Sequence, residues 1–218
     1  MQNARDLGIQ RVLHTSTSEV YGTARYVPID EQHPLQGQSP YSASKIGADK
    51  MAEAFHRSFQ LPVVTIRPFN TFGPRQSARA VIPTVIGQCL TGNTVRLGSL
   101  HPTRDLNFVA NTVEGYLLAA EVPAAVGETI NLGSQREISI GDLAQLIAKI
   151  VGKKVQIETE QQRFRPENSE VERLLASSVY AEELLGWKSR VSLEAGLKIT
   201  VDWMRENLEF YRPEKYAL

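Results

Sequence analysis

Several common signatures are missing from this sequence, beginning with cysteine. Its 218 residues include a single cysteine, Cys89, so no disulfide framework can form within the chain, and we expect a reducing, cytoplasmic setting. The chain has 24 basic and 24 acidic residues, and this zero net charge argues against a protein that binds nucleic acids or membrane surfaces. No apolar stretch approaches the roughly 20 residues of a membrane span, and the opening residues MQNARDLGIQ lack the apolar core of a signal peptide. We therefore expect neither a nucleic acid nor a membrane as a partner.

The chain also lacks a glycine-rich turn. A dinucleotide site on a doubly wound sheet needs closely spaced glycines after its first strand, because backbone N–H groups must approach the pyrophosphate. None of the 15 glycines forms a G-x-G pair. We therefore expect an N-terminally truncated form of a larger enzyme, with the first strand and its turn encoded upstream. The strand nearest to the missing part would then have an exposed edge.

What is present begins with a strand–helix–strand unit. Residues 11–15 (RVLHT) predict a short buried strand, and residues 62–67 (PVVTIR) predict a second one. Between them, Ser39 and Pro40 predict the start of a helix that runs to about Phe59. Its buried face is expected to be an apolar stripe of Ala48, Met51, Ala52, Phe55 and Phe59. Such a unit implies a parallel sheet, and ligands bind such sheets at the carboxyl ends of the strands.

The second half of the sequence alternates between short helices and short strands. Strands are predicted near residues 94–97, 105–109, 128–132 and 155–158. Helices are predicted over residues 82–90, 140–151 and 179–185. Two more are predicted, one ending near residue 120 and one beginning at residue 193. Asn111 and Glu114 resemble a capping box for the helix that ends near Ala120. Other helix ends are marked by Ser139 and Ser192 as N-caps and by Gly152 and Gly186 as terminators.

Two short motifs carry chemistry. The first is the segment Ser16–Glu19 (STSE), which directly follows the first predicted strand. The second is YSASK, in which Tyr41 and Lys45 are four residues apart and share one face of the predicted helix. A lysine ammonium beside a phenol stabilises the phenolate and lowers a pKa that is about 10 when unperturbed. Such a tyrosine can move protons on and off a hydroxyl near neutral pH. The four histidines show no metal-ligand spacing, so no metal site is expected.

Five stretches of the sequence together resemble a known family. They are TSEVYG (17–22), YSASK (41–45), RPFNTFGPR (67–75), Arg104-Asp105 and Arg165-Pro166-Glu167. They resemble the extended short-chain dehydrogenase/reductases of the NAD-dependent epimerase/dehydratase family. Within it they are most similar to the nucleotide-sugar 4,6-dehydratases that act on GDP-mannose, dTDP-glucose or UDP-N-acetylglucosamine. The resemblance covers essentially the whole chain, aligned to the later two thirds of the family.

The resemblance implies a fold and a division of the chain. The fold would be α/β, with the later strands of a Rossmann-like doubly wound parallel sheet and a small mixed α/β subdomain. Residues 1–75 and 110–134 would form the Rossmann-like part with the catalytic residues. Residues 76–109 and 135–218 would form the subdomain that binds the nucleotide sugar. The full-length form would be a homodimer through the helix that carries Tyr41 and the helix before the first strand.

The resemblance also implies catalytic roles. Tyr41 would take the proton from the sugar O4 while hydride leaves C4 for NAD, the expected cofactor, with NADP as an alternative. Lys45 would hold the nicotinamide ribose and keep the tyrosine acidic, and Thr17 would hydrogen-bond O4. Glu19 would remove the C5 proton that the C4 ketone acidifies. Water would then leave C6 and hydride would return there, so the cofactor is regenerated.

Binding residues follow from the same resemblance. Ser16, Pro68 and Phe69 would contact the nicotinamide end of the cofactor. The residues expected to bind the nucleotide sugar are Asn70 and Arg75 near the sugar diphosphate, Arg104 and Arg165 as a clamp on the diphosphate, and Arg79 and Val81 in the base pocket. Guanidinium groups suit this clamp because they donate two parallel hydrogen bonds.

Position 18 leaves alternatives open. The glucose-type dehydratases of this family carry an aspartate there, as the acid that protonates the leaving hydroxyl, whereas this chain has Ser18. The T-S-E form resembles GDP-mannose dehydratases, in which the glutamate can serve both steps, and also UDP-glucuronate decarboxylases. A UDP-sugar decarboxylase or a 4-epimerase is therefore the alternative enzyme. A third alternative, supported by the missing glycine-rich half, is a non-catalytic remnant that binds a nucleotide sugar or a partner chain.

Overall fold

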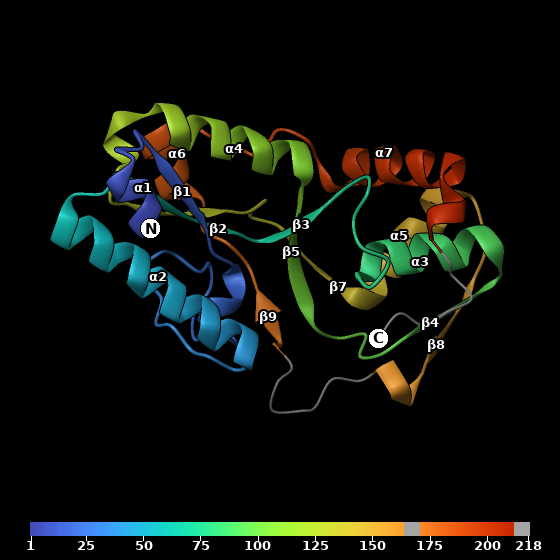
Figure 1. The fold of residues 1–218 in the computed structure, drawn as a ribbon. Coiled ribbons are helices and arrows are strands. Elements are labelled where there is room, and N and C mark those ends of the chain that lie inside the picture. Colours follow the sequence, from blue (N-terminus) through green and yellow to red (C-terminus); the bar gives the residue numbers. More distant parts are fainter. Residues whose placement is uncertain (164–170, 212–218) are drawn as a thin grey trace.

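The computed structural model describes residues 1–163 and 171–211 (Figure 1). Its first sheet has the strand order β1-β2-β6, and both pairings are parallel. The strands are β1 (Val12–Thr15), β2 (Val63–Pro68) and β6 (Thr129–Leu132), and α2 (Pro40–Phe59) connects the first two. The predicted strand–helix–strand unit and its parallel sheet are therefore confirmed. A short helix, α1 (Gln2–Asp6), precedes β1.

The remaining strands form two further sheets, one of four strands and one of two. In one, β5 (Thr103–Phe108) pairs with β3 (Asn70–Phe72), β7 (Glu137–Ser139) and β9 (Arg173–Leu174). In the other, β4 (Thr94–Leu97) pairs in parallel with β8 (Gln156–Thr159). The predicted strands correspond to β4, β5, β6 and β8, whereas β3, β7 and β9 were not predicted. Each of those three has only two or three residues, too few to show a period.

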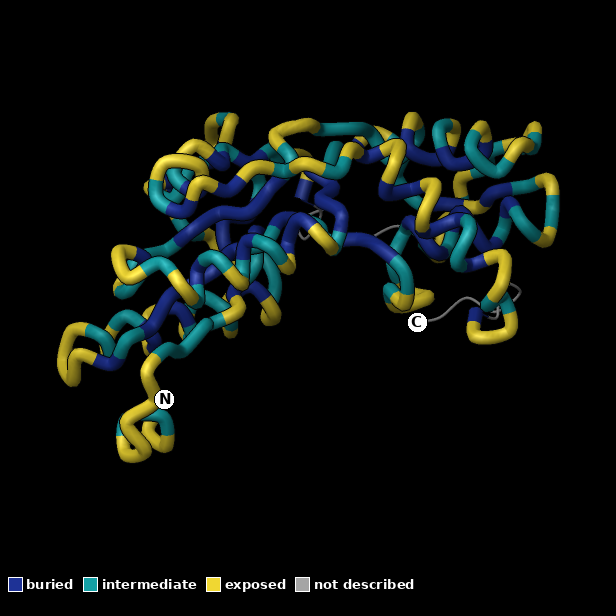
Figure 2. The backbone as a smooth tube through the Cα atoms, turned by 90° about the horizontal axis from the view of Figure 1, so that it is seen from above, coloured by how far each residue is buried: buried dark blue, intermediate teal, exposed yellow. Residues whose placement is uncertain are grey.

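Helices surround these sheets. They are α3 (Val81–Thr91), α4 (Val109–Glu121), α5 (Ile140–Val151), α6 (Val179–Leu185) and α7 (Leu193–Glu206). Figure 1 shows α2 and α4 on opposite faces of the first sheet, with α3, α5 and α7 gathered at the other end of the molecule. Buried backbone runs through both groups of elements, while the N-terminal segment around α1 is mostly exposed (Figure 2). None of the helices within the described residues is long and apolar enough to cross a membrane.

Local sequence explains where α2 begins. The Ser39 hydroxyl accepts a hydrogen bond from the Ser42 backbone N–H at 3.1 Å, and the Ser42 hydroxyl accepts one from the Ser39 N–H at 3.0 Å. This reciprocal capping satisfies two donors that the first turn leaves free. Pro40 follows at the first helical position, where no N–H is needed. The predicted start and the predicted last residue, Phe59, are both confirmed.

The predicted buried face of α2 is wrong in part. Met51 is 55% exposed and Phe59 is 50% exposed, while Ser42, Asp49 and Ala52 are the buried residues of this helix. The reason is that the sheet offers a buried arginine, Arg67, and the helix turns a carboxylate rather than a methionine toward it. Burial of an arginine without a partner would cost far more than leaving two apolar side chains at the surface.

Two further expectations need correction. The helix α4 begins at Val109, and Asn111 lies inside it at 2% exposure rather than capping it. Asn111 instead holds residues 189–191 by accepting from the Val191 N–H at 2.9 Å and donating to the Val191 carbonyl oxygen at 3.0 Å. The strand β1 is half-buried rather than buried. Within the described residues it lies at the edge of its sheet, with one side not paired to another strand.

Candidate active site

The predicted catalytic motifs meet at the carboxyl end of β1. There the chain enters a 3-10 turn, Ser18–Tyr21, which Thr17 caps by accepting a hydrogen bond from the Glu19 N–H at 3.2 Å. The backbone N–H of Ser16 donates to the Ile66 carbonyl oxygen at 2.8 Å, so the segment leaves directly from the sheet. Ser16 and Ser18 are each 3% exposed, whereas Thr17 and Glu19 are half-buried. Thr17 and Glu19 are thus the members of this segment that a ligand can reach.

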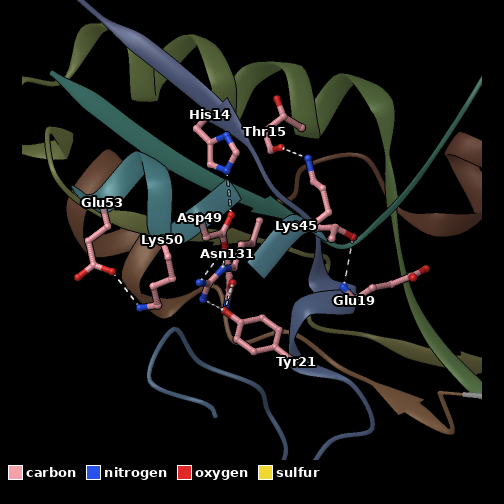
Figure 3. Close-up of polar contacts among 11 residues, drawn as sticks. His14, Thr15, Glu19, Tyr21, Lys45, Asp49, Lys50, Glu53 and Asn131 are labelled. Atoms are coloured by element: carbon pink, nitrogen blue, oxygen red, sulfur yellow. Dashed lines mark hydrogen bonds and ion pairs between the residues drawn. The ribbon is translucent and has the colours of Figure 1, made fainter. Parts of the chain in front are cut away.

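Lys45 joins the catalytic helix to the same strand end. Its Nζ donates to the Thr15 carbonyl oxygen at 2.6 Å, as Figure 3 shows. Tyr41 lies one turn earlier on α2 and is 53% exposed, so its phenol is open to a ligand. Thr15 directly precedes the STSE segment, so its contact with Lys45 places YSASK beside that segment. The sheet therefore contributes to this arrangement in addition to the helical spacing of Tyr41 and Lys45. The structure therefore brings Lys45, and with it the helix that carries Tyr41, to the strand end that Thr17, Ser18 and Glu19 follow.

The residues predicted to contact the nicotinamide follow from strand register. Because Thr15 pairs with Ile66, the segment after β1 emerges beside Pro68, the last residue of β2. Phe69 is 1% exposed and its N–H donates to the Leu132 carbonyl oxygen at 2.9 Å. Ser16, Pro68 and Phe69 thus lie at neighbouring strand ends, and Pro68 is the most exposed of the three. This arrangement fits a dinucleotide whose nicotinamide end lies over the carboxyl edge.

A cleft of about 590 Å³ adjoins this edge. Four of the residues predicted to bind the nucleotide sugar line it: Asn70, Arg79, Val81 and Arg104. Its lining also includes residues that were not predicted, among them Gln76 and Arg163. Arg163 could have been found as the first arginine of the RFRPE run, of which the sequence analysis singled out the second, Arg165. Arg165 lies outside the described residues.

The cleft also contains polar atoms suited to a ligand. The side-chain oxygens of Asn70 and Gln76 are buried and have no hydrogen-bond partner. An unmet buried acceptor costs free energy that a donor on a ligand would recover. With the arginines, the cleft can bind an anion and accept hydrogen bonds from polar groups attached to it. Arg75 does not reach this cleft; it lines a separate pocket of about 470 Å³ with Trp203, Phe210 and Tyr211.

A buried polar network lies behind the catalytic residues, and the sequence analysis missed it. Arg67 donates to Asp49 on α2 and to the Tyr21 hydroxyl, and Tyr21 donates to Asn131 on β6. Burial opposes ionisation of Asp49, but hydrogen bonds from neighbouring groups and the charge of Arg67 outweigh it and lower the pKa of Asp49. Burial raises the pKa of Tyr21 to about 12, so its hydroxyl keeps its proton and donates. Arg67 and Tyr21 were available as signals only as part of the family motifs.

A larger polar cleft, of about 670 Å³, opens between α2 and the loop that contains residues 30–33. None of the predicted site residues lines it. Several of its charged groups pair with one another, as in the 2.9 Å contact between Lys50 and Glu53. It is therefore distinct from the arginine-lined cleft, although Asp49 and Arg67 of the buried polar network lie in its wall.

The fold and the site define a class. A parallel Rossmann-like sheet, with a tyrosine and a lysine one helical turn apart beside its carboxyl edge, is the arrangement of a short-chain dehydrogenase/reductase. More particularly, the family model described as GDP-mannose 4,6 dehydratase matches residues 1–200, and the chain belongs to this family. The family resemblance and the partial Rossmann-like fold expected from the sequence are thereby confirmed.

Individual relatives agree with this assignment. The chain is 29% identical to the dTDP-D-glucose 4,6-dehydratase of Mus musculus, covering 99% of this chain and 61% of the mouse protein. It is 31% identical to the UDP-glucose 4-epimerase of Mycolicibacterium smegmatis, covering 93% and 64%. The dTDP-glucose 4,6-dehydratase of Bacillus anthracis, solved in complex with NAD, superimposes with a TM-score of 0.87 at 27% identity, covering 98% of this chain and 68% of that one. The chain thus spans less than two thirds of the curated relatives it matches.

Proposed function

We propose that this chain is the catalytic and substrate-binding part of an NAD-dependent nucleotide-sugar 4,6-dehydratase. The observation that carries the proposal is the contact of Lys45 with Thr15, which sets Tyr41 and Glu19 at one strand edge beside an arginine-lined cleft. A 4-epimerase needs the tyrosine and the lysine but no base for C5, so the presence of Glu19 favours dehydration. The cleft supplies the site for a nucleoside diphosphate, with Arg79, Arg104 and Arg163 for its charge.

The residues of the chain divide the proposed reaction between them. Tyr41 removes the proton of the sugar O4 as C4 becomes a ketone, and Thr17 hydrogen-bonds that oxygen. Glu19 then removes the C5 proton, which the ketone has made acidic. Because an aliphatic hydroxyl such as that of Ser18 is a much weaker acid than a carboxyl group, Glu19 returns this proton to the C6 hydroxyl, which leaves as water. NAD, when bound, would accept the hydride from C4 and return it to C6.

The fit of NAD to the described residues is partial. Pro68 and the exposed face of α2 suit the nicotinamide end, but Ser16 and Phe69 are almost fully buried and no glycine-rich turn is present for the pyrophosphate. We propose that a further strand with this turn lies beyond the open edge of β1. Calorimetry of the 218-residue chain with NAD tests this idea. Tight binding by the chain alone would contradict it, and binding that appears only in a longer form would support it.

Product analysis tests the reaction itself. We expect the form that binds NAD to convert a nucleotide hexose such as GDP-mannose, dTDP-glucose or UDP-N-acetylglucosamine into a product lighter by one water. A product of unchanged mass would identify a 4-epimerase instead. Release of carbon dioxide from UDP-glucuronate would identify a decarboxylase. Binding of nucleotide sugars without turnover in every form would identify a non-catalytic binding protein.

We also propose a homodimer through α1 and α2. Leu7, at the end of α1, is 76% exposed, and Met51 and Phe59 on α2 are 55% and 50% exposed. Contact of these apolar side chains with water is unfavourable. A second copy of the same surface would cover them. Sedimentation of M51E and F59E tests this proposal, since a charge at either position should favour the monomer. Unchanged sedimentation of both variants relative to the unsubstituted chain would argue against this interface.

A further inference from the structure

A network of buried hydrogen bonds crosses the face of the first sheet under α2. Arg67 on β2 donates from Nε and Nη2 to one oxygen of Asp49 at 3.1 and 3.0 Å, and from Nη1 to the Tyr21 hydroxyl at 2.9 Å. Its guanidinium also lies 5.0 Å from the centre of the Tyr21 ring. Asp49 and Arg67 are 5% and 6% exposed, and Tyr21 is fully buried. Arg67 is thus a single planar donor shared by two buried partners.

The two partners stand directly behind catalytic residues. Asp49 follows Lys45 by four residues on α2, so both lie on the face of the helix that meets the sheet. Tyr21 ends the 3-10 turn that carries Glu19. Figure 3 shows Asp49 and Tyr21 on the same side of the sheet, with Lys45 and Glu19 further toward its carboxyl edge. A displacement of either element therefore breaks a hydrogen bond to Arg67.

The network reaches every strand of this sheet. His14 on β1 meets the other oxygen of Asp49 at 2.9 Å. The Tyr21 hydroxyl donates to Asn131 on β6 at 2.7 Å, and the amide of Asn131 donates to the Ile29 carbonyl oxygen at 3.2 Å. All members of the network have partners, so the position of each is fixed by at least one neighbour on another element.

From this geometry we infer that Arg67 is a positioning residue that sets the Glu19 turn against the helix of Tyr41 and Lys45. The two elements perform successive parts of the proposed reaction, removal of the O4 proton and removal of the C5 proton, so their spacing must match the distance between two atoms of one sugar. Burial of an arginine between two polar partners carries a large desolvation cost, and well-packed apolar groups often stabilise a core equally well. Stability alone therefore does not explain this network. The inference rests on the proposed function only for what the two elements do.

Amide hydrogen exchange of the 218-residue chain tests the coupling without any turnover. Tyr21→Phe removes one hydroxyl and leaves the ring and the Arg67–Asp49 pair in place. Tyr180→Phe is the matched control, because it removes a half-buried tyrosine hydroxyl that lines the same polar cleft as Arg67 but donates to Glu128 instead, at 2.8 Å. We expect Y21F to speed exchange about five- to tenfold, the scale of one hydrogen bond, both in residues 18–21 and in the first turns of α2. Y180F should leave both segments unchanged.

A second variant keeps the charge and removes the fork. In Arg67→Lys the ammonium can pair with Asp49 but cannot donate to Tyr21 at the same time. We therefore expect R67K to fold and to speed exchange in residues 18–21 more than in α2. Faster exchange confined to residues 18–21 in Y21F, or equal effects of Y21F and Y180F on α2, would overturn the coupling.

Kinetics of the form that turns over then test its purpose. We expect Y21F to lower kcat about tenfold with little change in the KM for the nucleotide sugar, because the arginine-lined cleft is untouched. The loss should fall on elimination, so reduced cofactor accumulates during turnover of Y21F and not of Y180F. A rise in KM with kcat unchanged, or equal slowing of both steps, would overturn the positioning role. Absence of turnover in the unsubstituted protein would refute the proposed function and leave the exchange result to stand by itself.

Discussion

Two buried aspartates, one in each region of the molecule, are held in opposite ways. Asp49, on the buried face of α2, faces Arg67 and His14, and its pKa is lowered. Asp105, on β5, is fully buried, and its partners within the described residues are neutral donors, the N–H groups of Ser134, Gln135 and Ala176 and the Ser134 hydroxyl. Burial raises the pKa of Asp105, and these hydrogen bonds do not compensate for it.

The difference shows what each region is built to hold. Asp105 accepts hydrogen bonds from backbone N–H groups of the neighbouring loops and so holds those loops against β5. It does not connect a helix to a strand. Asp49 instead joins the helix that carries Lys45 to a strand through a directional contact with Arg67. We therefore expect changes under α2 to alter turnover as well as stability, and changes around β5 to alter binding or stability alone.

The largest expected effect lies at the helix of the first region. In the form that turns over, Tyr41→Phe removes the group that exchanges a proton with the sugar, and kcat should fall about 10²- to 10⁴-fold. The exposure of Tyr41 means that loss of its hydroxyl should cost little stability. Steady-state kinetics and urea unfolding measure the two effects. A variant that keeps more than a tenth of the normal kcat would show that Tyr41 is not the acid–base group.

Breaking the charge pair should cost stability on a similar scale. Asp49→Asn leaves Arg67 buried without its counter-charge, and we expect a loss of about 3–5 kcal/mol in the free energy of unfolding. The double variant D49L/R67M should lose less than D49N, since it removes both charges. Glu53→Gln is the control, because Glu53 pairs with Lys50 at the surface and should cost under about 1 kcal/mol. A loss in D49N no larger than that in E53Q would place the pair outside the energetics of the fold.

Sequence reasoning succeeded where a local rule decides the outcome. The start of α2 depends on Ser39, Pro40 and neighbours within three residues, and the parallel unit depends on two short apolar runs. It failed where distant residues compete for one position. Met51 is the more apolar residue, but α2 turns Asp49 toward the sheet because Asp49 pairs with Arg67, eighteen residues later in the chain, on β2. Asn111 likewise serves residues 189–191, which no local pattern connects to it.

The candidate site divides in the same way. Thr17, Glu19, Tyr41 and Lys45 were predicted from motifs that are compact in sequence, and the sheet brings them together. The substrate residues come from scattered segments, and there Arg75 lines the pocket around Trp203, whereas Gln76, next to it, lines both that pocket and the cleft. A positive φ of 67° at Arg75 turns the chain at this point, and spacing alone could not have shown it.

That difference between neighbours predicts the behaviour of the second region. Arg104→Ala should weaken binding of a nucleoside diphosphate about tenfold or more, the scale of one charge-assisted hydrogen bond. Arg75→Ala changes the same residue type outside the cleft and should leave the affinity unchanged. Calorimetry with UDP, GDP and dTDP measures both. An equal loss in R75A would show that the pocket around Trp203 contributes to the site.

The two aspartates should also respond to pH with opposite signs. The stability from Asp49 is present above its unfolded pKa of about 3.8 and is lost as pH falls through its lower folded pKa, so the deficit of D49N should shrink in acid. Asp105 has a raised folded pKa, so its contribution falls as pH rises from below 3.8 through that pKa, and the deficit of D105N should shrink in that direction. Urea unfolding between pH 3 and 7 measures both slopes. Parallel slopes would contradict the contrast between charged and neutral partners.

The smallest expected effects compare two helix caps. Ser39 accepts from the Ser42 N–H at 3.1 Å at the start of α2, and Ser192 accepts from the Ala195 N–H at 3.2 Å at the start of α7. Replacement of either by alanine should cost about 1 kcal/mol of stability. Only S39A should also lower kcat several-fold, since Tyr41 lies in the turn that its cap secures. Equal kcat in S39A and S192A would show that the first turn of α2 is held by the sheet contacts of Lys45 and Asp49 rather than by its cap.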